Sequence, residues 1–258
     1  MLLEYLKRVY ETPQPPNGGQ GGLDPAIWEL NFRSLEDAIS KSVGDVTKLD
    51  FGSSDQVLAT ALRENAAVFS AFKAHQEKAT LVKLLLDDAG VRRSWSDFKK
   101  LAAPITETYN KTWLETEYNQ AVSNAEMAKK WDGFTENADL YPNLEYRAVD
   151  DGHARPDHLA MNGMVAPIDD PIWDTWYPPN DWGCRCSVTQ TDKPVAMAAV
   201  ARAVSVQRVA PNKTPGFDFN PGKEQKLFAE SAGYFNQDKK TAKAIKKEAD
   251  SLLKGLDA

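Results

Sequence analysis

The chain has 258 residues, of which 42% are hydrophobic and 26% are charged, and its formal net charge is −6. This composition is ordinary for a soluble globular protein that buries a real core, and the acidic balance disfavours DNA binding by the whole surface. No run of about 18 apolar residues predicts a membrane span. The two cysteines, one residue apart, cannot form a disulfide framework, which indicates a reducing, cytosolic environment.

The first 22 residues predict a short arm. Residues 1–11 have the apolar spacing of an amphipathic helix, and residues 12–22 consist almost entirely of helix breakers, which predicts a linker. Their charges and the lack of a cleavage site predict no secretory signal. The helix is therefore either tethered and free to dock outside its own domain, or folded back onto the body.

Residues 23–140 predict a helical domain. Asp24-Pro25 starts one helix, and a second begins near residues 53–55 and runs towards residues 84–86. The lone histidine on the second helix, His75, is expected at the surface without a role. A third helical pattern is interrupted at Pro104 and is followed by a helix of about seven turns. Glu117 is expected on the solvent face of that long helix.

Residues 141–192 predict a small antiparallel β unit with long ordered loops. Residues 144–149 and 184–190 predict two strands, and a short helix is expected around residues 157–161. Residues 193–258 predict a helical and loop-rich tail, with one helix over residues 193–206 and others from residue 223 onward. The fold class is therefore α+β, with a mostly helical N-terminal body and a helical C-terminal tail.

The β unit gathers the side chains that bind soft metals. On an extended strand the sulfurs of Cys184 and Cys186 face the same side, and a disulfide between them would be strained. His153 and His158 could complete a tetrahedral zinc set with these thiols, although the spacing is not a standard zinc motif. The alternative is that the thiols are small buried hydrophobes and the imidazoles make structural hydrogen bonds.

Five aspartates near this stretch allow two interpretations. They could supply a carboxylate pair for hydrolysis or for a hard metal ion, or they could cap turns and helices, as the sequence before Ile172 indicates. The aspartates are Asp150, Asp151, Asp157, Asp169 and Asp170.

The order of several short motifs resembles a known family. The run Y-R-x-V-D-D-x-x-x-R-P-x-H is followed by N-G, by D-D-P-x-W and by Y-P-P-N-x-W-x-C-R-C, and together these are similar to the phage Mu F-like family of minor head proteins, related to the SPP1 minor capsid protein. The resemblance covers about residues 101–234, and it leaves His153 outside the matched positions. The motif residues are Arg147, Asp150, Arg155, His158, Gly163, Asp170, Trp173, Pro178, Pro179, Trp182 and Arg185.

The resemblance implies a structural, non-enzymatic protein of the phage head interior, present in the bacterial cytoplasm during assembly. It implies partners among the portal protein and the major capsid or scaffold proteins, and contact with packaged double-stranded DNA without sequence preference. A basic helix over residues 239–247 could touch DNA or an acidic partner, or it could be a solvated face. The alternative function is a metal-dependent hydrolase, nuclease or protease-like, that uses His158, Asp169 or Asp170 and an ion held by thiolates.

Overall fold

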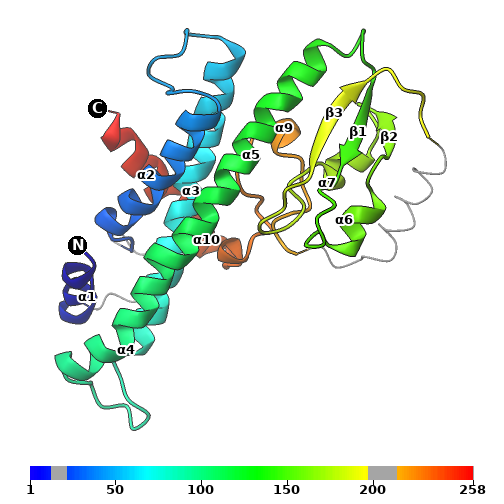
Figure 1. Cartoon of the computed structure of the whole chain (residues 1–258). Helices are drawn as coiled ribbons and strands as arrows, with labels where there is room; N and C mark the ends of the chain where they lie inside the picture. Colours follow the sequence, from blue (N-terminus) through cyan, green and yellow to red (C-terminus); the bar gives the residue numbers. More distant parts are fainter. Residues whose placement is uncertain (13–21, 197–213, 258) are drawn as a thin grey trace. The chain divides into compact units, whose positions relative to one another are not determined.

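The computed structural model describes residues 1–12, 22–196 and 214–257 (Figure 1). The chain forms two compact units, each assembled from stretches that are distant in sequence. The helical unit comprises Met1–Asp37, Arg63–Tyr118 and Tyr234–Ala258, and the sheet unit comprises Ala38–Leu62 and Asn119–Gly233. The predicted mostly helical α+β class is confirmed. Within the described ranges, no helix is both long enough and apolar enough to cross a bilayer.

Three of the long helices contribute residues to both units. The indole N–H of Trp28 donates to the carbonyl of Ala67, which ties α2 to α3 inside a core of aromatic and alanine side chains. The elements are α1 (Leu2–Glu11), α2 (Pro25–Ser42), α3 (Ser54–Lys83), α4 (Trp95–Glu107), a π-helical turn η1 (Thr108–Thr112), α5 (Trp113–Glu136), a 3₁₀ turn η2 (Gly233–Phe235) and α10 (Lys239–Leu256).

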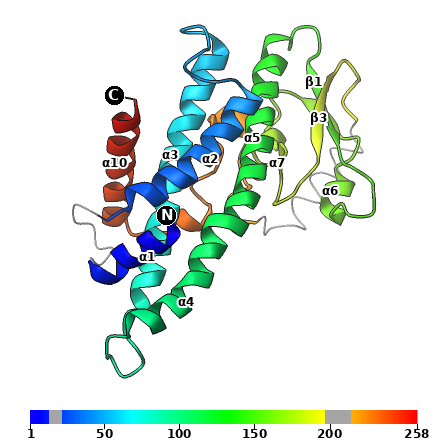
Figure 2. The same ribbon diagram turned by 60° about the vertical axis from the view of Figure 1, so that its left-hand side comes forward.

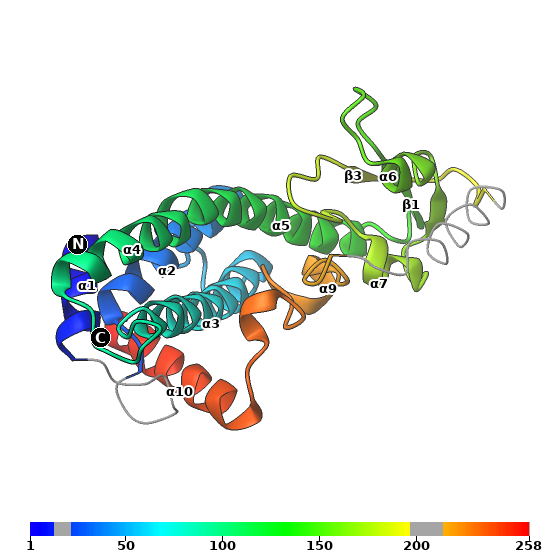
Figure 3. The ribbon, with the colours of Figure 1, turned by 90° about the horizontal axis from the view of Figure 1, so that it is seen from below.

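The first helix is folded back onto the body. Tyr5, Leu6 and Val9 are buried, and the ring of Tyr10 packs against those of Trp95 and Phe98. Figures 2 and 3 both show α1 beside α4. Of the two alternatives for the arm, the freely docking helix is therefore wrong, because its apolar face is already covered. The rest of the predicted linker, residues 13–21, lies outside the described residues.

The predicted break at Pro104 is wrong. Pro104 lies inside α4, and the chain continues through η1 into α5. Proline removes one backbone hydrogen bond, but burial of Phe98, Ala102 and Tyr109 on either side stabilises the helix. The π turn, which begins four residues after Pro104, absorbs the local distortion.

Two further predictions for the helices are wrong, because both side chains are buried. His75 is only 6% exposed, and its burial lowers the pKa of the imidazole. Glu117 accepts from Lys73 at 2.5 Å and from the hydroxyl of Tyr234 at 2.9 Å, inside the core of the helical unit. A buried ion pair looks the same in sequence as a solvent-facing one, so helical periodicity misplaces it.

The sheet unit contains the predicted antiparallel sheet and one additional short strand. The strand order is β2-β1-β3, and Leu144 lies opposite Ala166 on one side and Gln190 on the other. The elements are β1 (Asn143–Arg147), α6 (Pro156–Ala160), β2 (Val165–Pro167), α7 (Ile172–Trp176), β3 (Ser187–Thr191) and α9 (Pro221–Glu224). The strand expected from residue 184 begins at Ser187, so both cysteines precede it.

The core of the sheet unit is rich in aromatic residues. Tyr146 from β1, Trp173 and Trp176 from α7, and Tyr177 pack together with Trp131 from α5. The hydroxyl of Tyr177 donates to a backbone carbonyl of α5, which joins that helix to the core. The helix predicted over residues 193–206 is not seen in its described part, residues 193–196, and the rest of it lies outside the described residues.

Candidate functional site

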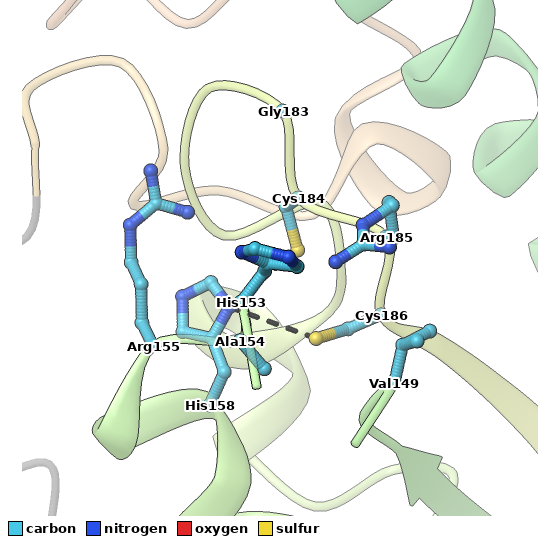
Figure 4. A pocket seen from close by; sticks show the side chains of 9 residues that line it. All are labelled: Val149, His153, Ala154, Arg155, His158, Gly183, Cys184, Arg185 and Cys186. Carbon is cyan, nitrogen blue, oxygen red and sulfur yellow. Dashed lines mark hydrogen bonds between the residues drawn. The ribbon is translucent and has the colours of Figure 1, made fainter. Parts of the chain in front are cut away.

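The cysteines and one histidine meet beside the sheet. His158 lies on α6, and Cys184 and Cys186 lie on the segment that enters β3 (Figure 4). The distances from His158 Nδ1 to the two sulfurs are 3.7 Å for Cys184 and 3.6 Å for Cys186. The donor atoms of these three residues all lie within 4.8 Å of one another. The structure thus brings together three of the four residues predicted as zinc ligands.

His153 lies at the mouth of the same cavity. It lines the cavity with Arg155, Val149 and the two cysteines, but its ring is exposed and it is not one of the three clustered donors. Its backbone N–H donates to the carboxylate of Asp151. The accessible volume of the cavity is about 20 Å³, which holds one ion or one water molecule and no organic substrate.

Local chemistry fixes His158 in place. Pro156 occupies the first turn of α6, where its missing N–H costs nothing, and the imidazole is buried edge-on to the indole of Trp176 with centroids 6.4 Å apart. The ring therefore presents Nδ1 to the sulfurs from a short helix anchored on the aromatic core.

The cysteine segment is held by a turn and by two ion pairs. The N–H of Cys184 donates to the carbonyl of Asp181, and Gly183 between them has a φ of +67°. Arg185 pairs with Asp151, with one N–O distance of 2.9 Å, and Arg155 pairs with Asp181 at 3.1 Å. Exposed pairs of this kind contribute little stability. Both arginines are nevertheless paired with carboxylates, and they connect the loops around the cluster.

The pKa values of the two thiols are shifted in opposite directions. A hydrogen bond from the Cys186 thiol, helped by His158, lowers the pKa of Cys184 well below its ordinary value, although burial opposes this change. The same hydrogen bond, together with burial, raises the pKa of Cys186. Of the two thiols, Cys184 is the one whose deprotonation its neighbours favour, and the thiolate is the form that binds soft metal ions.

None of the five predicted aspartates belongs to this cluster of donors. The carboxylate of Asp170 accepts the N–H of Ile172 and that of Asp157 accepts the N–H of His158, while Asp150 and Asp169 are exposed. The interpretation of these residues as turn-holding groups therefore describes Asp151 and Asp170, each of which accepts the N–H two residues further on. The hydrolase hypothesis required a carboxylate beside His158, and none of these aspartates supplies an oxygen to the cluster.

The remaining motif residues shape the sheet unit. Trp173 is buried in the core and donates to the carbonyl of Pro167, and Trp182 packs edge-on against Phe217. The other motif positions follow the same pattern: Gly163 has a φ of +74°, the Pro178–Pro179 peptide bond is cis, and Arg147 pairs with Glu145 at 2.9 Å.

Sequence reasoning did not single out two buried asparagines. Asn180 donates to the hydroxyl of Tyr146 and to the carbonyl of Trp176, which joins the loop before the cysteines to the core. Asn220 donates to the carbonyl of Trp173 and caps α9. Their positions beside prolines, in P-P-N and N-P-G, were the available signal, because such asparagines commonly hold turns.

Fold and site together define a class of protein: a mostly helical chain that carries a small sheet unit with a cysteine–histidine cluster. Residues 89–189 match the family model described as "Phage Mu protein F like protein". In this region, which is about two fifths of the chain, the protein is similar to the Mu F-like family.

Two curated relatives share parts of this region. Over 53 residues the chain is 57% identical to the "Mu-like prophage FluMu F protein" of Haemophilus influenzae, an alignment that covers 20% of this chain and 13% of that protein. Over 75 residues it is 45% identical to the "Putative capsid assembly protein F" of Escherichia phage Mu, covering 29% of this chain and 17% of that protein. The chain thus spans less than a fifth of either relative. No solved structure matches it.

Proposed function

We propose that this protein is a minor head protein of a phage or prophage, that it acts in head morphogenesis without catalysing a reaction, and that it associates with the portal and the inner capsid. The similarity to a putative capsid assembly protein supports the first part of this proposal. Location in the phage head, and in the bacterial cytoplasm during assembly, follows from the same proposal.

One observation carries the proposal: most of the motif side chains build a compact body, and few of them line a cavity. Trp173 lies in the core, Trp182 packs on Phe217, and the cluster of His158 and the cysteines surrounds a space of only about 20 Å³. A substrate pocket for a drug-sized molecule is an order of magnitude larger. A compact, rigid sheet unit of this kind suits a protein that other head proteins bind during assembly.

The test uses an inducible prophage that encodes this protein. Deleting the coding sequence should lower the yield of filled heads seen by electron microscopy, and a tagged wild-type copy should restore the yield. The tagged copy should sediment with purified particles and co-purify with the portal protein. A protein absent from both the particles and the portal complexes, with head yield unchanged by the deletion, would rule the proposal out.

Two tryptophan variants separate folding from assembly in the same assay. Trp173→Ala removes a fully buried side chain and should abolish rescue, because the sheet unit loses its core. Trp113→Ala removes a side chain that is 41% exposed and should leave the protein soluble and folded. Rescue by Trp113→Ala at the wild-type level, together with no rescue by Trp173→Ala, would show that assembly requires the folded sheet unit.

A metal-dependent hydrolase is the second candidate, because two cysteine sulfurs lie beside an imidazole in the cavity. Catalytic metal sites keep one coordination position open for water. Purified protein supplied with zinc would then cleave double-stranded DNA or capsid proteins, and Cys184→Ser would lose that activity. We expect no cleavage, since the carboxylate of Asp170 accepts the N–H of Ile172 and is not among the donor atoms that cluster with His158.

A further inference from the structure

The geometry points to a zinc-binding site that no relative's name records: we propose that His158, Cys184 and Cys186 bind one zinc ion, with His153 as the fourth ligand. The inference is independent of the proposed function. If the protein binds zinc but never enters a particle, the proposed zinc site stands and only the proposed function is wrong.

The first argument is the spacing of the donor atoms. A tetrahedral zinc ion with bonds of about 2.3 Å to sulfur and about 2.0 Å to nitrogen separates those two atoms by about 3.5 Å. The distances from His158 Nδ1 to the sulfurs of Cys184 and Cys186 are 3.7 Å and 3.6 Å. Both therefore match edges of one coordination tetrahedron without rearrangement of the backbone.

The second argument is the way in which one nitrogen faces two sulfurs. Nδ1 of an imidazole has either one hydrogen or one lone pair, so it can form one directed hydrogen bond. Two sulfurs at nearly equal distances from Nδ1 are not explained by a single hydrogen bond. An ion that lies among all three atoms accounts for both distances at once.

The third argument is charge. Zinc binds cysteine as the thiolate, and because Cys184 is buried, a thiolate there needs a compensating positive charge. The nearest guanidinium groups, on Arg155 and Arg185, are already paired with Asp181 and Asp151. Two thiolates and neutral imidazoles around Zn²⁺ form an electrically neutral set, which suits a site that is mostly shielded from water.

His153 is the candidate for the fourth position because of its place in the cavity. Its side chain is exposed and lines the cavity together with Cys184, as Figure 4 shows. Gly152, with a φ of +75°, forms the turn that leads to His153. The backbone N–H of His153 donates to Asp151, which also pairs with Arg185. A small movement of this exposed loop would close the site with a fourth nitrogen, giving the closed coordination of structural zinc.

The metal content of the full chain provides the first test. Protein purified under reducing conditions with zinc should retain one zinc ion per chain by elemental analysis. Replacement of zinc by cobalt should give thiolate-to-cobalt charge-transfer absorption and the intense visible bands of a tetrahedral site. Wild-type protein without stoichiometric zinc, or with an octahedral cobalt spectrum, would overturn the proposal. A disulfide between the two cysteines that persists under these reducing conditions would do the same.

Variants assign the ligands. Cys184→Ser, Cys186→Ser and His158→Gln should each abolish stoichiometric binding, whereas Val149→Ala, which changes a cavity-lining residue without a donor atom, should bind as wild type does. Loss of His153 as a ligand through His153→Gln should weaken binding by more than the roughly 10- to 100-fold caused by losing an outer-shell partner. Unchanged affinity in His153→Gln would exclude it as the fourth ligand.

If a ligand variant fails to fold, measurements on the wild-type protein still test the proposal. Titration of the wild-type protein with a mercurial that reacts with thiols should release zinc to a chromophoric chelator in proportion to the thiols blocked. Addition of a chelator should lower the melting temperature of the wild type and of Val149→Ala by the same amount. Release of no zinc on thiol modification would contradict ligation by the cysteines.

Discussion

Gly222 shows how closely α9 packs against α5 in the sheet unit. A methyl group at this position would lie 2.1 Å from Cβ and 2.4 Å from Cγ of Trp131, and Trp131 belongs to the core cluster. We expect Gly222→Ala to destabilise the protein by about 2–3 kcal/mol, because overpacking forces the indole or the short helix to move. Urea denaturation followed by far-UV circular dichroism measures the change.

Gly133 is the matched control, since it lies on the same helix as Trp131 and a methyl group there would meet no atom within 4 Å. Gly133→Ala should stabilise the protein by about 0.5–1 kcal/mol, because alanine loses less backbone freedom than glycine on entering a helix. Equal effects of the two substitutions would show that the close approach at Gly222 does not exist in solution.

Glu77 is a buried carboxyl group that makes stability depend on pH. Burial, only partly offset by hydrogen bonds from Asn110, raises its pKa from the ordinary value to about 7. A raised carboxyl pKa contributes stability that is fully present below the unfolded pKa and is lost as pH rises through the folded pKa. Stability should therefore fall between about pH 4.5 and pH 7, by on the order of 3 kcal/mol, and then level off.

The substitution Glu77→Gln isolates this contribution, because it keeps the size of the side chain and removes its charge. The variant should be more stable than wild type at pH 8, and the advantage should shrink towards pH 5. Glu115→Gln, an exposed substitution on α5, should follow the wild-type curve. Parallel curves for wild type and Glu77→Gln across this pH range would contradict the raised pKa.

At the scale of elements, α1 is part of the core of the helical unit. Leu6 is buried at 2% exposure, whereas Leu3 on the same helix is 48% exposed. Leu6→Ala should cost about 2–3 kcal/mol because it leaves a cavity against α4, and Leu3→Ala should change stability by less than about 0.5 kcal/mol. Chemical denaturation of both variants compares the two leucines directly. Equal small effects would mean that α1 is a free arm.

The elements also show what sequence can predict and why the rest escapes it. Capped, periodic helices such as α2 and α3 and the antiparallel pairing of β1 with β3 followed from local patterns. The break expected at Pro104 was wrong because burial on both sides outweighs one lost hydrogen bond. The three-residue strand β2 was not specified, since its pairing with β1 is a long-range contact that no local pattern encodes.

For the candidate site too, the sequence predicted some residues and missed others. Residue type alone indicated Cys184, Cys186 and His158, because few side chains bind soft metals, and the structure places them together. Asn180 and Asn220 were missed, since their hydrogen bonds join segments that are distant in sequence. Chemistry that resides in the side chain is visible in the sequence, whereas support that resides in the packing is not.

At the scale of the whole molecule, charge limits any binding of this protein to DNA. The net charge is −6, yet five exposed lysines lie within nine residues of α10, opposite the buried Ile245 and Ala249. We expect weak binding to double-stranded DNA through α10 alone. Each neutralised phosphate contributes about −0.9 to the slope of log affinity against log salt, so five lysines give a slope no steeper than about −4.5. The lysines are Lys239, Lys240, Lys243, Lys246 and Lys247.

Two double variants separate this local patch from the total charge. Lys243→Glu with Lys247→Glu reverses two charges one helical turn apart on α10 and should abolish binding measured by fluorescence anisotropy in low salt. Lys99→Glu with Lys100→Glu changes the net charge by the same amount on the exposed face of α4 and should retain most of it. Equal losses in both variants would assign the binding to net charge, and a flat salt dependence in wild type would exclude phosphate contacts through α10.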